Sequence, residues 1–305
     1  MAFAADATAP TAPAAPGCQP LRKVTSLDMQ ALADGRVKVP VTLADRPAAL
    51  LFDTGSPFRT LRPEAVTALG LTPVIGGDVV KGIPGQENAK NVMLPSVTLG
   101  TYKMPDAAFL ISTPSKADAP VDGLLTLDML VDFDVDMDFV GNKLSLFLQD
   151  HCQGRVVYWP STGLAVVPFF FDAMNRINFP VHIDGVPMVG VLDTGAAGTS
   201  LDLDAAKASG AQPATDGMTK TGEVRNGKDV YQRRFKSLSF EDITIANTMI
   251  DLMQSGKAAA KAGQAVATPP VVIGMNVLKK LHVYIALQER TLYITPGAVP
   301  TPAAQ

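Results

Sequence analysis

The sequence contains little of the side-chain chemistry on which most enzymes depend. It has only two cysteines and three histidines among its 305 residues. His151, His182 and His282 show no metal-ligand spacing, and neither a G-x-S-x-G nor an H-E-x-x-H motif occurs. A Cys–His nucleophile built on Cys152 has no other support in the sequence. We therefore expect no metal and no cofactor, and we interpret the three histidines as structural or surface residues.

Charge and long apolar runs are also scarce. Charged residues make up 18% of the chain, the net charge is −3, and the lysines and arginines are scattered. The sequence therefore has no basic patch of the kind that binds nucleic acid. No run approaches the roughly eighteen apolar residues of a membrane span. The length fits one large domain or two modest ones, each able to bury a core.

One apolar pattern occurs twice. Leu51–Ser56 reads LFDTGS and Val191–Ala196 reads VLDTGA. Each reads as a buried strand that ends in an aspartate, followed by a glycine that lets the backbone turn. A buried carboxyl is costly unless it has a partner, and two close carboxyls can share one proton. The pattern predicts that Asp53 and Asp193 form an acid/base pair able to activate water.

The sequence around these two runs also matches at a fixed offset. Asp53 and Asp193 lie 193 − 53 = 140 residues apart. The same offset pairs Arg36 with Arg176, Pro40 with Pro180 and Gly70 with Gly210. Further on, Leu125 matches Ile273 at 273 − 125 = 148, and we place the extra residues in a loop at 255–270. These matches predict two lobes built from one repeated unit.

The local patterns predict many short strands. Residues 22–52 alternate apolar and polar positions between turns at 34–35 and 45–47. A short helix at 63–69 begins at a proline and stops at a glycine. We expect a hairpin at 79–92, a helical turn at 124–130 and a closing hairpin at 133–148. The expected fold class is all-β, with barrel-like lobes and few short helices.

Two further motifs each allow two structural interpretations. Asp132, Asp134, Asp136 and Asp138 suggest a calcium loop, but the sixth position is Met137 where glycine is required. We prefer a strand with one acidic, solvated face. Residues 222–228 match most of a phosphate loop, but aspartate follows where serine or threonine is needed. We prefer a β-turn there.

The two cysteines flank the first predicted lobe. Cys18 precedes it and Cys152 follows its last strand. We favour a disulfide in an exported protein, and the alternative is two unrelated thiols in a cytosolic protein. The Ala- and Pro-rich start is expected to be disordered. We consider residues 1–5 as the remnant of an export signal, which leaves a periplasmic or secreted location as the working hypothesis.

Taken together, these features resemble the retropepsin-like and pepsin-like aspartic peptidases, specifically a bacterial two-lobed form. The resemblance rests on Asp-Thr-Gly-Ser/Ala in each half, on a Gly-rich stretch at 81–85 and on an apolar-apolar-Gly segment at 272–274. It covers roughly residues 24 to 295. Thr126 departs from the family pattern, because the first half has threonine where the second has Gly274.

The resemblance implies an aspartic endopeptidase that acts on a peptide or protein substrate. It implies two β-barrel lobes related by pseudo-two-fold symmetry, with the catalytic residues Asp53 and Asp193 at their interface. The supporting loop residues would be Thr54, Gly55, Ser56, Thr194, Gly195 and Ala196, and the flap residues Gly82, Ile83, Pro84 and Gly85. We also expect the Ser56 hydroxyl to donate to Asp53 and favour its ionised form.

Two other interpretations fit the same sequence features. A catalytically silent peptide-binding protein would keep the fold and lose turnover. A dimer could pair its lobes between chains, whereas the simpler expectation is a monomer with both aspartates in one chain.

We expect a tail at 1–20, lobes at 21–153 and 154–297, and a second tail at 298–305.

Overall fold

The computed structural model describes residues 18–75, 90–112, 121–161, 163–208, 217–225, 228–254 and 270–297. The expected flap residues Gly82, Ile83, Pro84 and Gly85 lie outside these ranges, as do both expected tails except for residues 18–20. Most of the expected loop at 255–270 also lies outside them.

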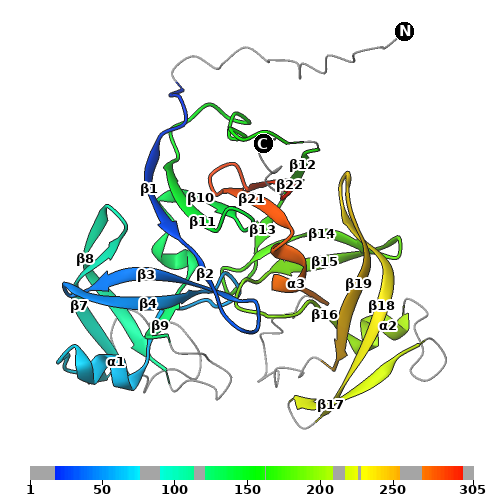
Figure 1. Ribbon diagram of the computed structural model, residues 1–305, viewed down its shortest axis with the longest axis horizontal. Helices are drawn as coiled ribbons and strands as arrows, with labels where there is room; N and C mark the ends of the chain where they lie inside the picture. Colours follow the sequence, from blue (N-terminus) through cyan, green and yellow to red (C-terminus); the bar gives the residue numbers. More distant parts are fainter. Residues whose placement is uncertain are drawn as a thin grey trace, which may run out of the picture.

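The first half of the chain forms an eight-stranded sheet (Figure 1). A second pairing, between β3 and β7, folds this sheet back on itself into a barrel-like lobe. The strands follow one another in space as β2 (Gln30–Ala31), β3 (Val37–Leu43), β4 (Arg46–Phe52), β9 (Gly123–Leu125), β5 (Thr60–Leu61), β8 (Tyr102–Ile111), β7 (Lys90–Leu99) and β6 (Val74–Ile75).

The second half forms an eight-stranded sheet with the equivalent strand order. Its extra pairing joins β14 to β18, as β3 joins β7 in the first lobe. The order is β13 (Phe170–Phe171), β14 (Ile177–Ile183), β15 (Val186–Leu192), β20 (Val271–Ile273), β16 (Ser200–Asp202), β19 (Ile243–Met253), β18 (Lys228–Phe240) and β17 (Thr219–Arg225). The molecule therefore has the expected two all-β lobes related by pseudo-two-fold symmetry.

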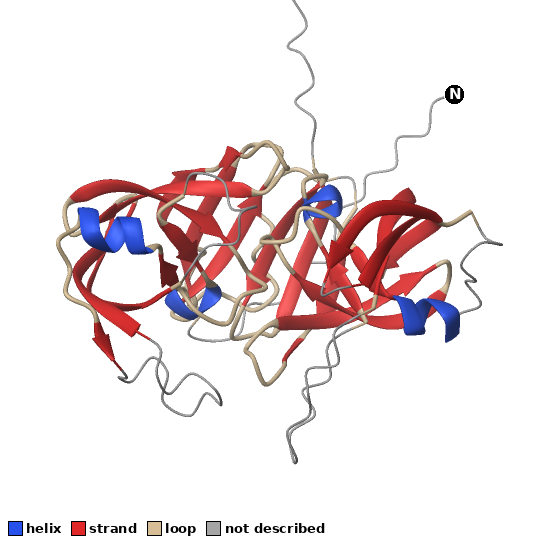
Figure 2. Ribbon diagram, turned by 90° about the horizontal axis from the view of Figure 1, so that it is seen from below, coloured by secondary structure: helices blue, strands red, loops and turns tan. Residues whose placement is uncertain are grey.

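Helices are short and few among the described residues. They are α1 (Pro63–Ala68), α2 (Leu203–Ala208) and α3 (Met275–Leu278), with one 3₁₀ turn, η2 (Leu127–Met129). Figure 2 shows how strands dominate the architecture. The helix expected at 124–130 is wrong at its start, because Leu124 and Leu125 belong to β9 and pair in parallel with β4. Among the described residues, no helix has the length and apolar character needed to span a membrane.

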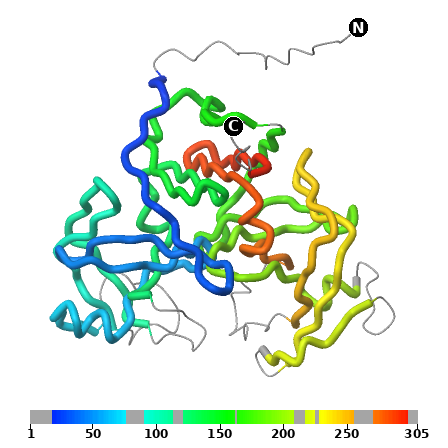
Figure 3. Tube along the Cα trace, in the orientation of Figure 1, coloured from blue at the N-terminus to red at the C-terminus, as the bar shows by residue number. Residues whose placement is uncertain are grey.

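A third sheet of six strands joins the two lobes. Its order is β1 (Lys23–Asp28), β11 (Lys143–Leu148), β10 (Phe133–Asp138), β21 (Leu281–Ala286), β22 (Thr291–Pro296) and β12 (Ala165–Pro168). The expected hairpin at 133–148 is present as β10 and β11. Its partner hairpin comes from the end of the chain, and β10 pairs with β21 at the centre of the sheet. The trace in Figure 3 shows these distant segments side by side between the lobes.

A disulfide fastens one edge of this third sheet. Cys18 and Cys152 are bonded, 134 residues apart in the sequence. Gln19 also forms a bridge with His151 next to the disulfide. The bond therefore ties the entry into β1 to the segment that leaves β11.

The acidic face expected on residues 132–138 is wrong for Asp134 and Asp136, each of which is only 1% exposed. The imidazole Nε2 of His151 lies 2.5 Å from Asp134, and Nε2 of His282 lies 2.6 Å from Asp136. We call these four residues the Asp–His layer. Strand alternation places the aspartates on one face of β10 but does not reveal that the chain covers that face.

The covering segment is the connection that follows β11. Trp159 stacks on the His282 ring at 3.7 Å between centroids. Tyr158 donates to Asp136 at 2.5 Å, and the amide N–H of Leu287 donates to Asp134 at 2.9 Å. The Asp–His layer thus binds together the first half, the connection and the second half. His182 is exposed, so the three histidines occupy structural and surface positions.

Candidate active site

The two Asp-Thr-Gly runs occupy equivalent places in the two lobes. Asp53 directly follows the last residue of β4, and its amide N–H donates to Leu125 O of β9 at 2.9 Å. In the same way, Asp193 directly follows the last residue of β15, and its amide N–H donates to Ile273 O of β20 at 3.1 Å. We call residues 53–59 the first loop and residues 193–199 the second loop. Each aspartate is fixed at the end of a buried strand by a parallel neighbour.

Two threonines join the loops across the lobe interface. The Thr54 hydroxyl donates to Leu192 O at 2.8 Å and accepts from the Thr194 amide at 3.1 Å. The Thr194 hydroxyl donates to Phe52 O at 2.7 Å and accepts from the Thr54 amide at 3.1 Å. Both side chains are buried, with residue exposures of 1% and 0%. Because each hydroxyl satisfies one donor and one acceptor of the opposite lobe, the four bonds form a symmetric lock.

The glycines bring each carboxyl against the opposite loop. A β-carbon added at Gly55 would lie 2.2 Å from Cγ of Asp193. One added at Gly195 would lie 2.3 Å from Cγ of Asp53. Any side chain at either position would collide with a carboxyl, so the close approach of the aspartates requires glycine. We call Asp53 and Asp193 the carboxyl pair.

The two carboxyls have different partners. Asp53 Oδ1 accepts hydrogen bonds from the amides of Gly55 at 2.9 Å and Ser56 at 3.0 Å. Asp193 Oδ1 is buried and has no hydrogen-bond partner among the described residues. The expected bond from the Ser56 hydroxyl to Asp53 is wrong, because that hydroxyl donates to Phe58 O at 3.2 Å. Ser56 acts on Asp53 through its backbone instead.

Comparison with known families identifies the fold. A profile of the aspartyl protease family matches residues 39–129 and 179–277. The chain belongs to the aspartyl protease family. The two matched segments begin at equivalent points of β3 and β14 and end in η2 and α3, so each lobe of this family member supplies one match.

Solved structures share the two-lobed architecture. The aspartic proteinase from Irpex lacteus is 14% identical, with a TM-score of 0.53 over 92% of this chain and 99% of that one. Basic 7S globulin from soybean is 10% identical, with a TM-score of 0.51 over 94% and 98% of the chains. A search of curated proteins finds no match. At these identities the structural likeness concerns the fold alone.

Burial and mutual charge shape the protonation of the carboxyl pair in this aspartyl protease fold. Burial, and then the negative charge of Asp53, raises the pKa of Asp193 to about 7, although the amides of Gly195 and Ala196 oppose the rise. Burial also raises the pKa of Asp53, but the amides of Gly55 and Ser56 oppose the rise. A hydrogen bond from the Asp193 side chain acts in the same opposing direction. Burial and mutual repulsion therefore make the pair hold a proton more readily than isolated carboxyls do, and the two groups titrate as a coupled pair.

Two arginines complete the electrostatics of the site. The sequence identified Arg36 and Arg176 only as matched positions, without a role. Their positive charges oppose the rise in pKa, Arg36 at Asp53 and Arg176 at Asp193. Each is itself held by an aspartate of its own turn, Arg36 by Asp34 at 2.8 Å and Arg176 by Asp172 at 2.7 Å. The matching offset was the signal that could have identified them.

Two other candidate sites are resolved by the structure. Strands β17 and β18 pair antiparallel up to Arg225 and Lys228, which favours the β-hairpin interpretation over the phosphate loop; residues 226–227, where the turn is expected, lie outside the described residues. Within the described residues, no three His, Cys, Asp or Glu side chains gather to hold a metal ion. The calcium-loop reading of Asp134 and Asp136 therefore has no support in this part of the chain.

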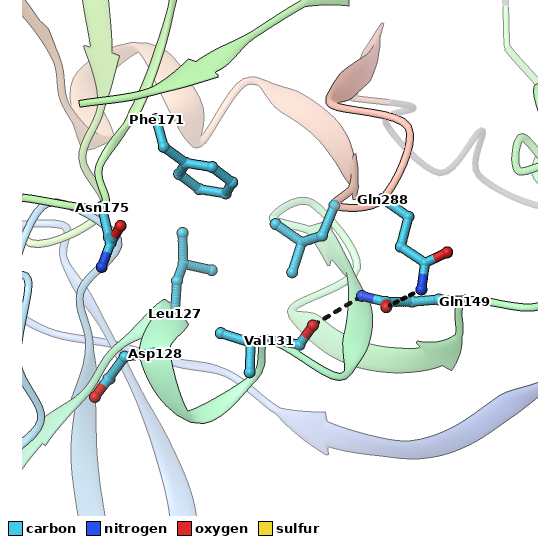
Figure 4. A pocket seen from close by; sticks show the side chains of 8 residues that line it. Leu127, Asp128, Val131, Gln149, Phe171, Asn175 and Gln288 are labelled. Atoms are coloured by element: carbon cyan, nitrogen blue, oxygen red, sulfur yellow. Dashed lines mark hydrogen bonds between the residues drawn. The ribbon is translucent and has the colours of Figure 1, made fainter. Parts of the chain in front are cut away.

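A cavity of about 280 Å³ lies elsewhere at the lobe interface (Figure 4). Leu127, Asp128 and Val131 line it from the first lobe, and Phe171 and Asn175 from the second. Neither aspartate of the carboxyl pair lines it. The cavity borders η2.

Proposed function

We propose that the chain is an aspartic endopeptidase that hydrolyses peptide bonds with a water activated between Asp53 and Asp193. The observation that carries the proposal is the asymmetric carboxyl pair. Two amide donors hold Asp53 Oδ1, whereas Asp193 Oδ1 is buried and lacks a hydrogen-bond partner among the described residues. General acid–base catalysis needs one ionised and one protonated group at the same pH, and this asymmetry favours that state.

The roles follow from the protonation states. Asp53, the more readily ionised carboxyl, is the general base that takes a proton from the water. Asp193, protonated, donates a hydrogen bond to the peptide carbonyl oxygen and stabilises the charge that develops there. The water oxygen bonds to the carbonyl carbon, and the resulting tetrahedral intermediate collapses as a proton passes from the pair to the leaving amine. The threonine lock keeps both carboxyls at the fixed separation that this sequence of steps requires.

The accompanying assignments belong to the same proposal. Gly82, Ile83, Pro84 and Gly85 would cover an extended peptide bound by strand-like main-chain pairing. The chain would act as a monomer with lobes at 21–153 and 154–297. The disulfide fits an oxidising compartment, which supports a periplasmic or secreted location.

The test is cleavage of a complex peptide library from pH 3 to 8. Wild type is compared with Asp53→Asn, Asp193→Asn and the control Asp45→Asn, which alters an exposed ion pair with Lys103. The proposal expects cleavage by wild type and the control, and none by the two active-site variants. Cleavage that survives either variant would contradict the assigned roles. Peptide binding without cleavage by any of the four proteins would favour a silent peptide-binding protein.

A further inference from the structure

The second loop is held from behind by a neutral side-chain pair. The Thr199 amide and hydroxyl both donate to Oδ1 of Asn276, at 2.8 and 2.7 Å. Asn276 Nδ2 donates in turn to Met249 O of β19 at 3.0 Å. The Gly274 amide donates to the Thr199 hydroxyl at 3.1 Å. The side-chain oxygen and nitrogen atoms of this pair all have partners, and neither side chain is charged.

The first loop has an ion pair at the equivalent positions. By the two offsets, Arg59 corresponds to Thr199 and Asp128 to Asn276. Arg59 Nη1 donates to Asp128 Oδ2 at 3.1 Å, and its Nε donates to Ala108 O at 2.5 Å. The parallel pairings of β5 with β8 and of β16 with β19 make Ala108 O the counterpart of Met249 O. Asp128 has no side-chain N–H that could donate to Ala108 O. Arg59 therefore donates to both Ala108 O and the Asp128 carboxylate.

The backbone support also differs between the lobes. A β-carbon added at Gly274 would lie 2.3 Å from the carbonyl oxygen of Gly198. This closeness lets the first two amides of α3 donate to carbonyls of the second loop, at 2.8 and 3.1 Å. Thr126 stands at the position of Gly274 and carries a β-carbon. In the part of the chain that the structure describes, no backbone hydrogen bond joins η2 to the first loop.

The Thr126 side chain contributes to the first-lobe arrangement instead. Its hydroxyl donates to Oδ1 of Asp128, the oxygen that Arg59 leaves free for it. The Arg59 guanidinium lies 6.0 Å from the ring centre of Phe109. Figure 4 shows the Asp128 carboxylate pointing away from the neighbouring cavity. Arg59 and Asp128 are 23% and 28% exposed, so solvent screens their attraction only in part.

We propose that Arg59 and Asp128 are positioning residues for Asp53: in the first lobe their ion pair takes the place of the neutral pair and of the backbone bonds that hold the second loop. The inference rests on the proposed function. The arginine fork is suited to the task because it binds a carboxylate and a carbonyl in one plane. Thr126, whose hydroxyl donates to Asp128, then belongs to the set of side chains that holds the first loop in place.

The kinetic test replaces the supporting side chains of the first loop with those of the second loop. Arg59→Thr and Asp128→Asn each break the ion pair, and the triple variant Thr126→Gly/Arg59→Thr/Asp128→Asn rebuilds the second-lobe set of side chains in the first lobe. A pair of neutralising substitutions at the exposed Lys103–Asp45 pair is the control. Activity is expressed per site that binds a peptide with a hydroxyethylene group in place of the scissile bond, so unfolded protein is not counted.

We expect Arg59→Thr to lower kcat by about 100-fold with little change in KM, the effect of misplacing a reacting group by about 1 Å. The triple variant should regain most of that loss, and the control should match wild type. If activity per binding site is unchanged in Arg59→Thr, or the folded triple variant recovers nothing, the positioning role is wrong.

A second readout does not depend on catalysis. Hydrogen exchange of the Gly55 and Ser56 amides, which hold Asp53, reports directly on the first loop. Arg59→Thr should accelerate their exchange about tenfold and leave the Gly195 amide unchanged. Equal acceleration in both loops, or none, would overturn the inference. Selective acceleration in a protein without turnover would uphold the positioning role and refute the proposed peptidase instead.

Discussion

The threonine lock provides a prediction whose size can be worked out from its contacts. Thr54→Val removes one hydroxyl and keeps the shape of the side chain. Leu192 O then loses its donor and the Thr194 amide loses its acceptor, both in a buried place. An unsatisfied buried polar group costs about 1–3 kcal/mol, so the two groups together should lower the free energy of unfolding by about 2–6 kcal/mol.

Urea unfolding followed by circular dichroism measures this loss. Fluorescence of Trp159, the single tryptophan, gives a second probe in the third sheet, and coincident curves support a two-state analysis. Thr54→Ser keeps the hydroxyl and should cost much less than Thr54→Val. Thr67→Val is a matched control, because Thr67 also donates to a backbone carbonyl but is exposed. Equal stabilities of the Thr54→Val and Thr54→Ser variants would refute the reasoning.

Three further changes have definite expected outcomes. Gly195→Ala drives a methyl group against the Asp53 carboxyl and should abolish cleavage while the protein stays folded, as measured by kcat and circular dichroism. Asp53→Asn removes a negative charge, so carbon-13 NMR should show the pKa of Asp193 falling below about 7; an unchanged value contradicts the coupling. His151→Ala strips the partner from buried Asp134 and should cost about 3–5 kcal/mol in urea unfolding. Because Asp134 raises the pKa of His151, the ion-pair part of this cost should shrink as the pH rises through that raised pKa, and it should also shrink in acid once Asp134, whose own pKa is raised by burial, is protonated.

The sequence predicted the positions of the two Asp-Thr-Gly runs better than their surroundings. The Asp-Thr-Gly runs are local patterns, and their matched offsets placed both aspartates, threonines and glycines without any structure. The partner of the Ser56 hydroxyl could not be predicted, because the fold of the first loop brings Phe58 O within its reach. The flap residues remain a prediction, since they lie outside the described residues.

The third sheet shows what local patterns leave out. The alternation around Asp134 and Asp136 predicted a strand, and β10 is that strand. Whether its acidic face meets water depends on His282, 146 residues away, and on the connection that carries His151 and Trp159. No periodicity within β10 encodes that contact. The pairing of β10 with β21, which joins the two closing hairpins, could not be predicted for the same reason.

The replacement behind the first loop shows a similar limit. Thr126 departs from the family pattern, and the sequence alone left its consequence open. Its meaning depends on Arg59 and Asp128, which the fold brings together across 69 residues. Residues that match by offset can therefore do the same job with different chemistry.

The most direct test of the central claim is one turnover in water enriched in oxygen-18, with enzyme in excess over a cleavable peptide. If a water between Asp53 and Asp193 attacks the carbonyl, the new carboxyl of the first product contains the label and the enzyme contains none. Label on an aspartate of the enzyme would instead indicate covalent attack by that carboxyl, and would contradict the account. Two other results would contradict it too: a product without the label, and undiminished cleavage by the Asp193→Asn variant.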